Sequence, residues 1–293
     1  MPCVESPAKS FAVQDYDLEM TLTSGQAFRW RLEGDSWTSV IQGRWVLLQS
    51  NRSSITAHTV DTCVDWSWLT HYLQLELDLA PVLASFPDDE PMRAAVAACR
   101  GLRLLRQDPW ECLASFILSS TKQISQIQQI VSLLCQRYGQ LVATTQDRPP
   151  VRSFPSPERL AAAPETELRK CKMGFRAPFL LAAARKIAEG KLDLNTLFKL
   201  PIHEARAELL QLHGVGEKIA NCVLLFAFGQ QSAFPVDVWV MKALRQLYFP
   251  NRKVSLAKLQ DFACSHFGSN AGYAQQYLFH YARQQMRQRG AKR

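Results

Sequence analysis

Residues 212–222 read LHGVGEKIANC and place a Gly-x-Gly turn directly before a predicted helix. The segments PIHEARAELLQ before it and KIANCVLLFAFG after it both show helical periodicity, so only LHGVGE separates two helices. So short a connection requires backbone torsions that glycine adopts at little cost, which accounts for Gly214 and Gly216. The turn also leaves free amide groups at the positive end of a helix dipole, where a phosphate can bind.

This pattern predicts a helix–hairpin–helix motif, which holds a DNA backbone without reading its sequence. An ordinary corner between two helices is the alternative, and a bare Gly-x-Gly does not exclude it.

Lys218 lies in the first turn of the second helix, where the helix dipole disfavours a cation. Desolvation in a cleft would add to this effect, and both favour the neutral, nucleophilic amine. Asp237, in AFPVDVWVMKAL, begins the next helix, and residues 229–236 are long enough to bring it back to the lysine. An amine facing a carboxylate suits attack on an electron-poor carbon, although a surface lysine and a helix cap fit the spacing equally well.

The charge of the chain is uneven. Its 293 residues carry a formal net charge of +8, yet residues 1–90 hold 13 Asp and Glu against 5 Lys and Arg. Residues 239–293 hold 10 Lys and Arg against 1 acidic residue, and the pI is near 9.1. An acidic first third joined to a basic remainder indicates either a solvated surface or a polyanionic partner such as nucleic acid.

The 8 cysteines are scattered, without a CxxC pair, a zinc-spaced Cys/His cluster or an iron–sulfur run. This distribution favours an intracellular protein with reduced thiols. No apolar run is long enough for a transmembrane helix, and MPCVESPAKSFAVQDYDLEM does not read as a signal peptide.

The expected fold class is α+β, with an N-terminal antiparallel β-rich domain over residues 1–90 and a mostly helical body over 91–293. Strands are expected within 20–60, followed by one helix from Trp66 to near Pro87. Asp108 and Pro109 predict a helix start, and Gly139 a helix end. The segment TTQDRPPVRSFPSPE is expected to be a loop, and further helices are expected at about 176–189, 202–211, 217–228, 238–247, 255–267 and 271–288.

LHGVGEKIANC followed by FPVDVW resembles the helix–hairpin–helix DNA glycosylase superfamily, with its glycine-rich loop and final aspartate. Further segments, in the same order as in the family, are similar to the 8-oxoguanine DNA glycosylases: SGQAFRW (24–30), GLRLLRQDPWECLASFILSS (101–120), GFRAPF (174–179) and AGYAQQYLF (271–279). The resemblance covers nearly the whole chain.

The resemblance implies a bifunctional DNA N-glycosylase and AP lyase of base excision repair that flips 8-oxoguanine out of the duplex. Lys218 would attack the anomeric carbon of the sugar, expel the base as a Schiff base forms, and nick the strand by β-elimination. Asp237 would stabilise the oxocarbenium-like transition state.

Four residues are expected around the flipped base. A carbonyl at Gly25 would accept from N7–H of 8-oxoguanine and repel the bare N7 of guanine. The resemblance implies that Phe279 and Cys222 stack on the base and that Gln275 reads its Watson–Crick edge. Without it, Phe279 and Cys222 would be taken as core residues.

The DNA-binding residues implied are Gly214, Gly216, Thr121, Lys122, Phe175, Arg176 and Trp239. Phe175 would be an aromatic wedge and Arg176 would contact the orphaned cytosine. The chain departs from the family at SSTKQISQ, where Thr121, Lys122 and Gln123 replace an asparagine-rich turn and Gln126 replaces an arginine. His213 also replaces a proline of the hairpin, and Trp239 a histidine. The changes in SSTKQISQ predict a weaker preference for cytosine opposite the lesion.

No cofactor and no side-chain metal site are expected, although the carbonyls of Leu210, Leu212 and Val215 are arranged in sequence as in hairpins that hold a monovalent cation. The expected partner is double-stranded DNA containing oxidised guanine, with no membrane. We expect an intracellular monomer. The sequence does not distinguish a bacterial cytoplasm or nucleoid from a nucleus. The basic C-terminal tail is expected to add affinity for DNA.

Three alternatives remain. An alkylated-base glycosylase of the same superfamily typically lacks the hairpin lysine and hydrolyses with water. A non-catalytic DNA-binding module would leave Lys218 and Asp237 without a purpose. A relative of adenine glycosylase or endonuclease III would carry an iron–sulfur cysteine run, and this sequence contains none.

Overall fold

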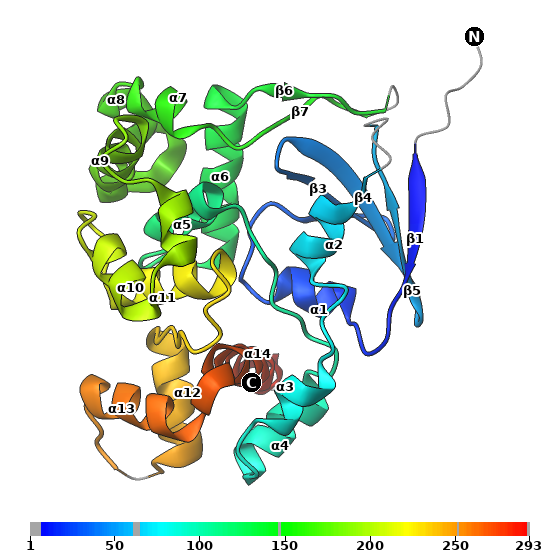
Figure 1. Ribbon diagram of the computed structural model, residues 1–293, viewed down its shortest axis with the longest axis vertical. Coiled ribbons are helices and arrows are strands. Elements are labelled where there is room, and N and C mark those ends of the chain that lie inside the picture. The colour runs from blue at the N-terminus through cyan, green and yellow to red at the C-terminus, as the bar shows by residue number, and fades with distance from the viewer. Residues whose placement is uncertain (1–6, 61–64, 146–147, 251, 292–293) are drawn as a thin grey trace.

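The N-terminal part of the chain forms an antiparallel sheet that stands beside a larger group of helices in the computed structural model (Figure 1). The structure describes residues 7–60, 65–145, 148–250 and 252–291. The sheet has five strands in the order β1-β5-β4-β3-β2. Their bounds are β1 Ala8–Ala12, β2 Arg31–Glu33, β3 Ser36–Ile41, β4 Arg44–Ser50 and β5 Ser54–His58.

The central hairpin of the sheet explains its register. Ile41 pairs with Arg44, so that only Gln42 and Gly43 form the turn, and both have positive φ of 49° and 78°. Such two-residue turns match the twist of antiparallel strands. The expected class, α+β with an antiparallel N-terminal sheet, is confirmed.

Two details of the N-terminal half were predicted wrongly. Residues 20–23 are helical rather than extended, because α1 (Leu18–Thr23) starts at Asp17, whose carboxylate accepts from Met20 N at 2.7 Å. The single helix expected from Trp66 is broken into α2 (Ser67–Leu73) and α3 (Ala80–Ala84). Gln74 ends α2 in the left-handed region at φ 54°.

The helical body follows the periodicity closely. Asp108 caps α5 through Glu111 N at 2.8 Å, and α6 ends at Gly139, as predicted. The helices expected after residue 176 are all present. The segment expected to be a loop contains a two-residue strand, β7, paired with β6. The bounds are α4 Glu90–Ala98, α5 Pro109–Leu118, α6 Ile124–Tyr138, β6 Leu141–Val142, β7 Val151–Arg152, α7 Pro157–Ala161, α8 Glu165–Leu168, α9 Ala177–Ala188, α10 Ile202–Leu210, α11 Glu217–Phe226, α12 Val238–Tyr248, α13 Leu256–His266 and α14 Ala271–Ala291.

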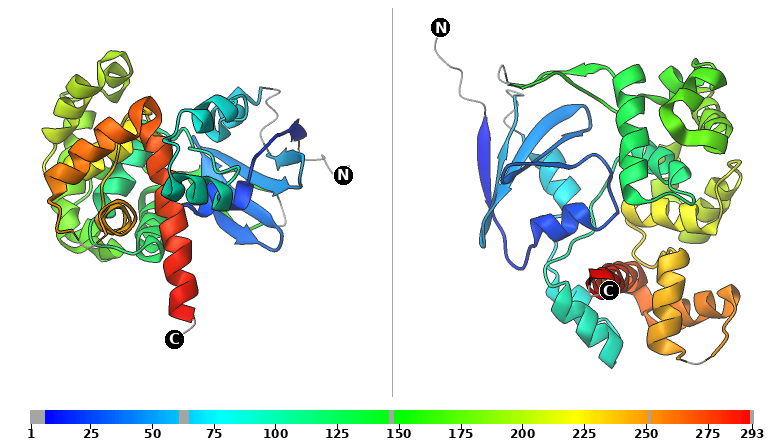
Figure 2. Two further views of the ribbon diagram at one scale, coloured as in Figure 1. Left: turned by 90° about the horizontal axis from the view of Figure 1, so that it is seen from below. Right: turned by 180° about the vertical axis from the view of Figure 1, so that it is seen from behind.

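Two hydrophobic cores hold these parts. One lies between the sheet, α1 and α2, and it also takes in Leu105. The other fills the helical body. It includes Leu79 and Val82, which precede the expected domain boundary at residue 90, and Met92, which follows it. The division into 1–90 and 91–293 stays a prediction, and the cores divide earlier, after α2. Helix α14 packs against α4 and α12, and its C-terminal half projects from the body (Figure 2).

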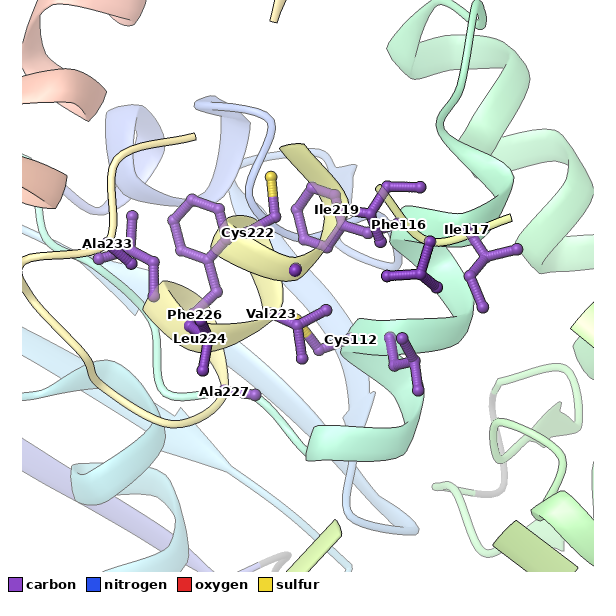
Figure 3. Packing of buried hydrophobic residues seen from close by; sticks show 14 of the residues in the cluster. Cys112, Phe116, Ile117, Ile219, Cys222, Val223, Leu224, Phe226, Ala227 and Ala233 are labelled. Atoms are coloured by element: carbon purple, nitrogen blue, oxygen red, sulfur yellow. The ribbon is translucent and has the colours of Figure 1, made fainter. Parts of the chain in front are cut away.

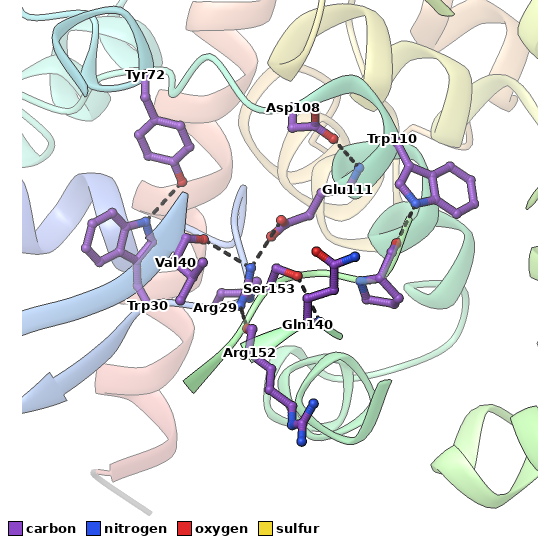
Figure 4. A network of polar contacts seen from close by, with 11 residues as sticks. Arg29, Trp30, Val40, Tyr72, Asp108, Trp110, Glu111, Gln140, Arg152 and Ser153 are labelled. Carbon is purple, nitrogen blue, oxygen red and sulfur yellow. Dashed lines mark hydrogen bonds and ion pairs between the residues drawn. The ribbon is translucent and has the colours of Figure 1, made fainter. Parts of the chain in front are cut away.

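A partly buried arginine joins the sheet to the helical body (Figure 4). Arg29 donates to the carbonyl of Val40 at 3.0 Å, to the carbonyl of Arg152, and to Glu111 Oε2 at 3.4 Å. Burial raises the pKa of Glu111 to about 6, although the Arg29 guanidinium opposes this. These contacts fix the start of α5 against the sheet.

Within the described ranges, no helix is both long and apolar enough to cross a bilayer. The six cysteines in these ranges are free thiols, and Cys3 and Cys63 lie outside them. Residues 1–6, the start of the segment that does not read as a signal peptide, also lie outside them.

Candidate active site

The hairpin between α10 and α11 needs glycine at one of its two positions. Gly214 has φ +84°, and an added Cβ would lie 2.5 Å from the ring of Phe179. Gly216 caps α11 with extended torsions, φ −105° and ψ −179°, and its Cβ position meets open space. The torsional argument therefore holds for Gly214 and is wrong for Gly216. The absence of a side chain at Gly216 leaves the start of α11 uncovered.

Lys218 projects from the first turn of α11 toward the end of α5. Its Nζ donates to Ser119 Oγ at 2.9 Å and lies 5.1 Å from the centre of the Phe116 ring. The Ser119 hydroxyl donates its own hydrogen to the carbonyl of Phe116 at 2.7 Å. The Ser119 oxygen therefore accepts the hydrogen bond from Lys218 through a lone pair. Because the Ser119 hydroxyl already donates its hydrogen to Phe116, it does not donate to the lysine nitrogen.

This placement rests on the packing of α5 against α11 (Figure 3). Phe116 and Ile117 of α5 meet Ile219, Cys222 and Val223 of α11 in the interior. Two neighbouring rings, Phe116 and Phe226, stack with centroids 5.6 Å apart. Sequence reasoning missed Ser119 and Phe116 as partners of the lysine, because nothing in the local pattern shows that residues 119 and 218 meet.

Asp237 caps α12, where its Oδ1 accepts from Val240 N at 2.7 Å. It lines the same cavity as Lys218, and the two side chains form no ion pair with one another. Trp239, which is 49% exposed, stands beside it at the rim. The two residues thus line one cavity, and both act electrostatically on the thiol of Cys222.

A cavity of about 680 Å³ opens between the sheet side and the helical body. Its walls hold all four residues expected around a base, both expected catalytic residues, and Lys122 and Trp239. The volume lies within the range of about 300–1,000 Å³ typical of ligand pockets. Segments that are distant in the sequence therefore converge on one space.

One part of the cavity wall, called the inner wall below, combines apolar groups with a buried amide and consists of Gly25, Ile124, Cys222, Gln275 and Phe279. Gly25 has φ +87°, and a Cβ there would lie 2.8 Å from Ile124 and 3.6 Å from the Phe279 ring. Gln275 is 4% exposed, and its Oε1 has no hydrogen-bond partner in the described part of the chain. Burial raises the pKa of Cys222 to about 11, against the influence of Lys218 and with that of Asp237, so its thiol is neutral.

Five of the expected DNA contacts do not line the cavity, and three of these five, Phe175, Arg176 and Thr121, are joined by contacts of Arg176. Phe175 is 55% exposed, as expected for a wedge, whereas Arg176 is only 2% exposed. The Arg176 guanidinium lies 4.2 Å from the Phe175 ring and donates to Ser120 O and to Thr121 Oγ1. Thr121 has φ 57°, a conformation that a β-branched residue seldom adopts. Arg176 must leave these partners before it can contact DNA.

Metal ligation has little support from side chains. Among the described residues, no group of three or more His, Cys, Asp and Glu side chains could hold a metal ion. On the hairpin backbone, the Leu212 carbonyl accepts from Val215 N at 3.0 Å, and no such bond engages the carbonyls of Leu210 and Val215 within the described ranges. The monovalent cation at these carbonyls stays a prediction.

Comparison with known proteins covers almost the whole chain. Residues 10–113 match the family described as 8-oxoguanine DNA glycosylase, N-terminal domain, and residues 114–262 match the HhH-GPD superfamily of base excision DNA repair proteins. A probable N-glycosylase/DNA lyase of Methanothermobacter thermautotrophicus is 31% identical over 92% of this chain and 95% of its own. N-glycosylase/DNA lyase OGG1 of Arabidopsis thaliana is 33% identical over 89% of this chain and 76% of its own.

A solved structure has nearly the same fold. It is the 8-oxoguanine glycosylase/lyase of Clostridium acetobutylicum in complex with double-stranded DNA containing cytosine opposite 8-oxoG. It has 30% identity and a TM-score of 0.88, and the match covers 95% of this chain and 98% of that one.

Proposed function

Because the chain belongs to the 8-oxoguanine DNA glycosylase family, we infer that it is a base-excision DNA glycosylase with AP lyase activity, and we propose Lys218 as its nucleophile. The observation that carries this assignment is the position of the Lys218 amine. Ser119 holds it at 2.9 Å in the cavity that Asp237 and Gln275 also line. The substrate proposed is double-stranded DNA that contains 8-oxoguanine.

In the proposed reaction, the Lys218 nitrogen forms a bond to C1′ as the glycosidic bond breaks, and the base leaves with the bonding electrons and takes up a proton. The sugar ring opens to a Schiff base. Loss of a proton from C2′ then expels the 3′ phosphate and nicks the strand. The carboxylate of Asp237, fixed by its bond to Val240 N, stabilises the positive charge that develops on the sugar.

Base recognition is assigned to the inner wall. The Gly25 carbonyl accepts from N7–H, and the buried amide of Gln275 reads the Watson–Crick edge, which supplies a partner for its unpaired Oε1. Phe279 and the neutral thiol of Cys222 contact the faces of the base. A buried carbonyl that accepts a hydrogen bond from N7–H of 8-oxoguanine discriminates strongly against guanine, which lacks that hydrogen.

The remaining residues hold the duplex. The hairpin at Gly214 and Gly216 grips a phosphate with the amides of α11, and Phe175 fills the gap left by the flipped base. Arg176, Thr121, Lys122 and Trp239 complete the contact surface. With the substitutions in SSTKQISQ, we propose a preference for cytosine opposite the lesion that is weaker than a strict one, and a monomer as the acting species.

A duplex with 8-oxoguanine, labelled on the damaged strand, tests the proposal. We expect release of the base, nicking 3′ to the lesion and a covalent adduct with borohydride. Lys218→Gln loses all three, whereas Lys258→Gln, which alters an exposed lysine of α13, keeps them.

Other outcomes identify the alternatives. Base release without an adduct indicates a water-using glycosylase, and binding without base release indicates a non-catalytic module. Excision measured opposite each of the four bases tests the weakened preference, which a strong preference for cytosine would contradict. Size-exclusion chromatography tests the monomer.

A further inference from the structure

The loop that carries Gly25 is held by glutamine side chains on both sides. Gln276 Nε2 donates to the carbonyl of Ser24 at 3.1 Å, and Gln107 Nε2 donates to the carbonyl of Gln26 at 2.7 Å. No donor in the described ranges reaches the carbonyl of Gly25. Of these three successive carbonyls, that of Gly25, a residue lining the cavity, is therefore without such a donor.

The side chain of Gln26 anchors the same loop from behind. It is fully buried, its Nε2 donates to Arg103 O at 2.8 Å, and its Oε1 accepts from Leu105 N at 2.7 Å. The Nε2 also lies 2.9 Å from Ser24 Oγ. This amide therefore binds the loop to the segment 103–105 through both of its polar atoms.

The clamp also connects the loop to the walls that carry the proposed chemistry. The backbone amide of Gln107 donates to Phe226 O, at the end of the helix that begins beside Lys218, at 2.8 Å. Gln276 follows Gln275 on α14, and both line the cavity. These bonds thus link the Gly25 loop to the far end of α11 and to the neighbour of Gln275 on α14.

We propose that Gln26, Gln107 and Gln276 are positioning residues that determine specificity by preventing rotation of the Gly25–Gln26 peptide. The role rests on the proposed function, in which the Gly25 carbonyl faces N7 of the damaged base. The same peptide carries the N–H of Gln26. If it rotated, the N–H would face the cavity and donate to N7 of undamaged guanine.

Glycine makes such a rotation easy in the absence of restraint, because its torsions are little restricted. Repulsion between the Gly25 carbonyl and guanine N7 rejects guanine only while the carbonyl cannot turn away. The bonds to the flanking carbonyls and to Gln26 supply that restraint, since each would have to break or strain during the rotation.

The test uses Gln276→Met, which removes one donor and keeps the side-chain length. Binding to duplexes with 8-oxoguanine or guanine opposite cytosine is measured in a Lys218→Gln background, where no excision occurs. We expect the preference for 8-oxoguanine to fall about tenfold, the size of one hydrogen bond's contribution. Nicking of a duplex with an abasic site, measured with Lys218 intact, is expected to stay within about twofold, since no base is read there.

Gln276→Glu provides a second, independent test. Its ionised carboxylate would face the Ser24 carbonyl and repel it, whereas its protonated form donates as the amide does. Discrimination by this variant is expected to recover toward that of the wild type as the pH falls, and that of Gln276→Met is not. Gln260→Met on α13 controls for the general effect of removing a glutamine.

The outcomes separate the two proposals. Full discrimination in Gln276→Met, or equal losses in base discrimination and abasic-site nicking, contradicts the clamp alone. A wild-type protein that excises no 8-oxoguanine but nicks abasic sites contradicts the proposed substrate, and the role of the clamp with it.

Discussion

The turn of the hairpin offers a matched pair of substitutions, Gly214→Ala and Gly216→Ala. At Gly214, φ is +84° and the added methyl would lie 2.5–2.8 Å from three atoms of Phe179. The left-handed conformation costs about 1–2 kcal/mol for a non-glycine residue, and overpacking costs about 1–3 kcal/mol. We therefore expect Gly214→Ala to lose about 2–5 kcal/mol of the free energy of unfolding.

At Gly216 the backbone is extended and the methyl meets open space. Alanine is a poorer helix cap than glycine, so the loss is expected to stay below about 1 kcal/mol. Urea denaturation followed by circular dichroism measures both values. Each kcal/mol corresponds to about 2–4 °C in melting temperature for a chain of this order of size, so the two variants are readily distinguished.

A third variant tests the steric part of the argument. Phe179→Ala removes the ring that the new methyl would contact, so Gly214→Ala combined with Phe179→Ala is expected to lose less stability than the sum of the single changes. Equal stability of Gly214→Ala and Gly216→Ala would refute the reasoning. Simple additivity with Phe179→Ala would refute the assigned contact.

Three further predictions concern other parts of the molecule. Ser119→Ala is expected to slow single-turnover formation of the borohydride-trapped adduct at least tenfold, by about the contribution of a charged hydrogen bond, with DNA affinity unchanged in fluorescence anisotropy. Burial raises the pKa of Glu111 from 4.5 to about 6, so the folded state binds this proton more tightly than the unfolded state does. The free energy of unfolding of the wild type is therefore expected to fall as the pH rises from 4.5 to 6.5. Relative to Glu111→Gln, urea denaturation is expected to show a fall of about 1 kcal/mol, which is less than the full pKa shift would give because the side chain is partly exposed. Phe175→Ala is expected to weaken binding to a lesion duplex about tenfold or more while leaving the melting temperature within about 2 °C, because the ring is exposed in the free protein.

Local signals account for what the sequence predicted well. The caps at Asp108 and the end of α6 at Gly139 follow from side-chain and backbone chemistry within one helical turn. The shared cavity of Lys218 and Asp237 agrees with the chain length, because residues 229–236 are long enough to return over the length of α11. The helix at Leu18–Thr23 was missed because six residues are too few to show a periodic pattern.

The contacts that position the site were beyond sequence reasoning. Ser119 meets Lys218 across 99 positions, and Gln276 meets Ser24 across 252. A glutamine or serine in a helix shows no pattern that reveals which distant carbonyl or amine it will reach. The resemblance supplied the cavity residues, but it did not supply the burial of Arg176 or the glutamine bonds around Gly25.

The central claim is that Lys218 forms the covalent bond to the DNA. The direct measurement is mass spectrometry of the borohydride-reduced complex after nuclease and trypsin digestion. Modification of Lys218 blocks cleavage there, so the added sugar is expected on one peptide that spans residues 207–242. Fragment ions that place the sugar on Lys218 agree with the account, whereas an adduct on any other lysine would contradict it.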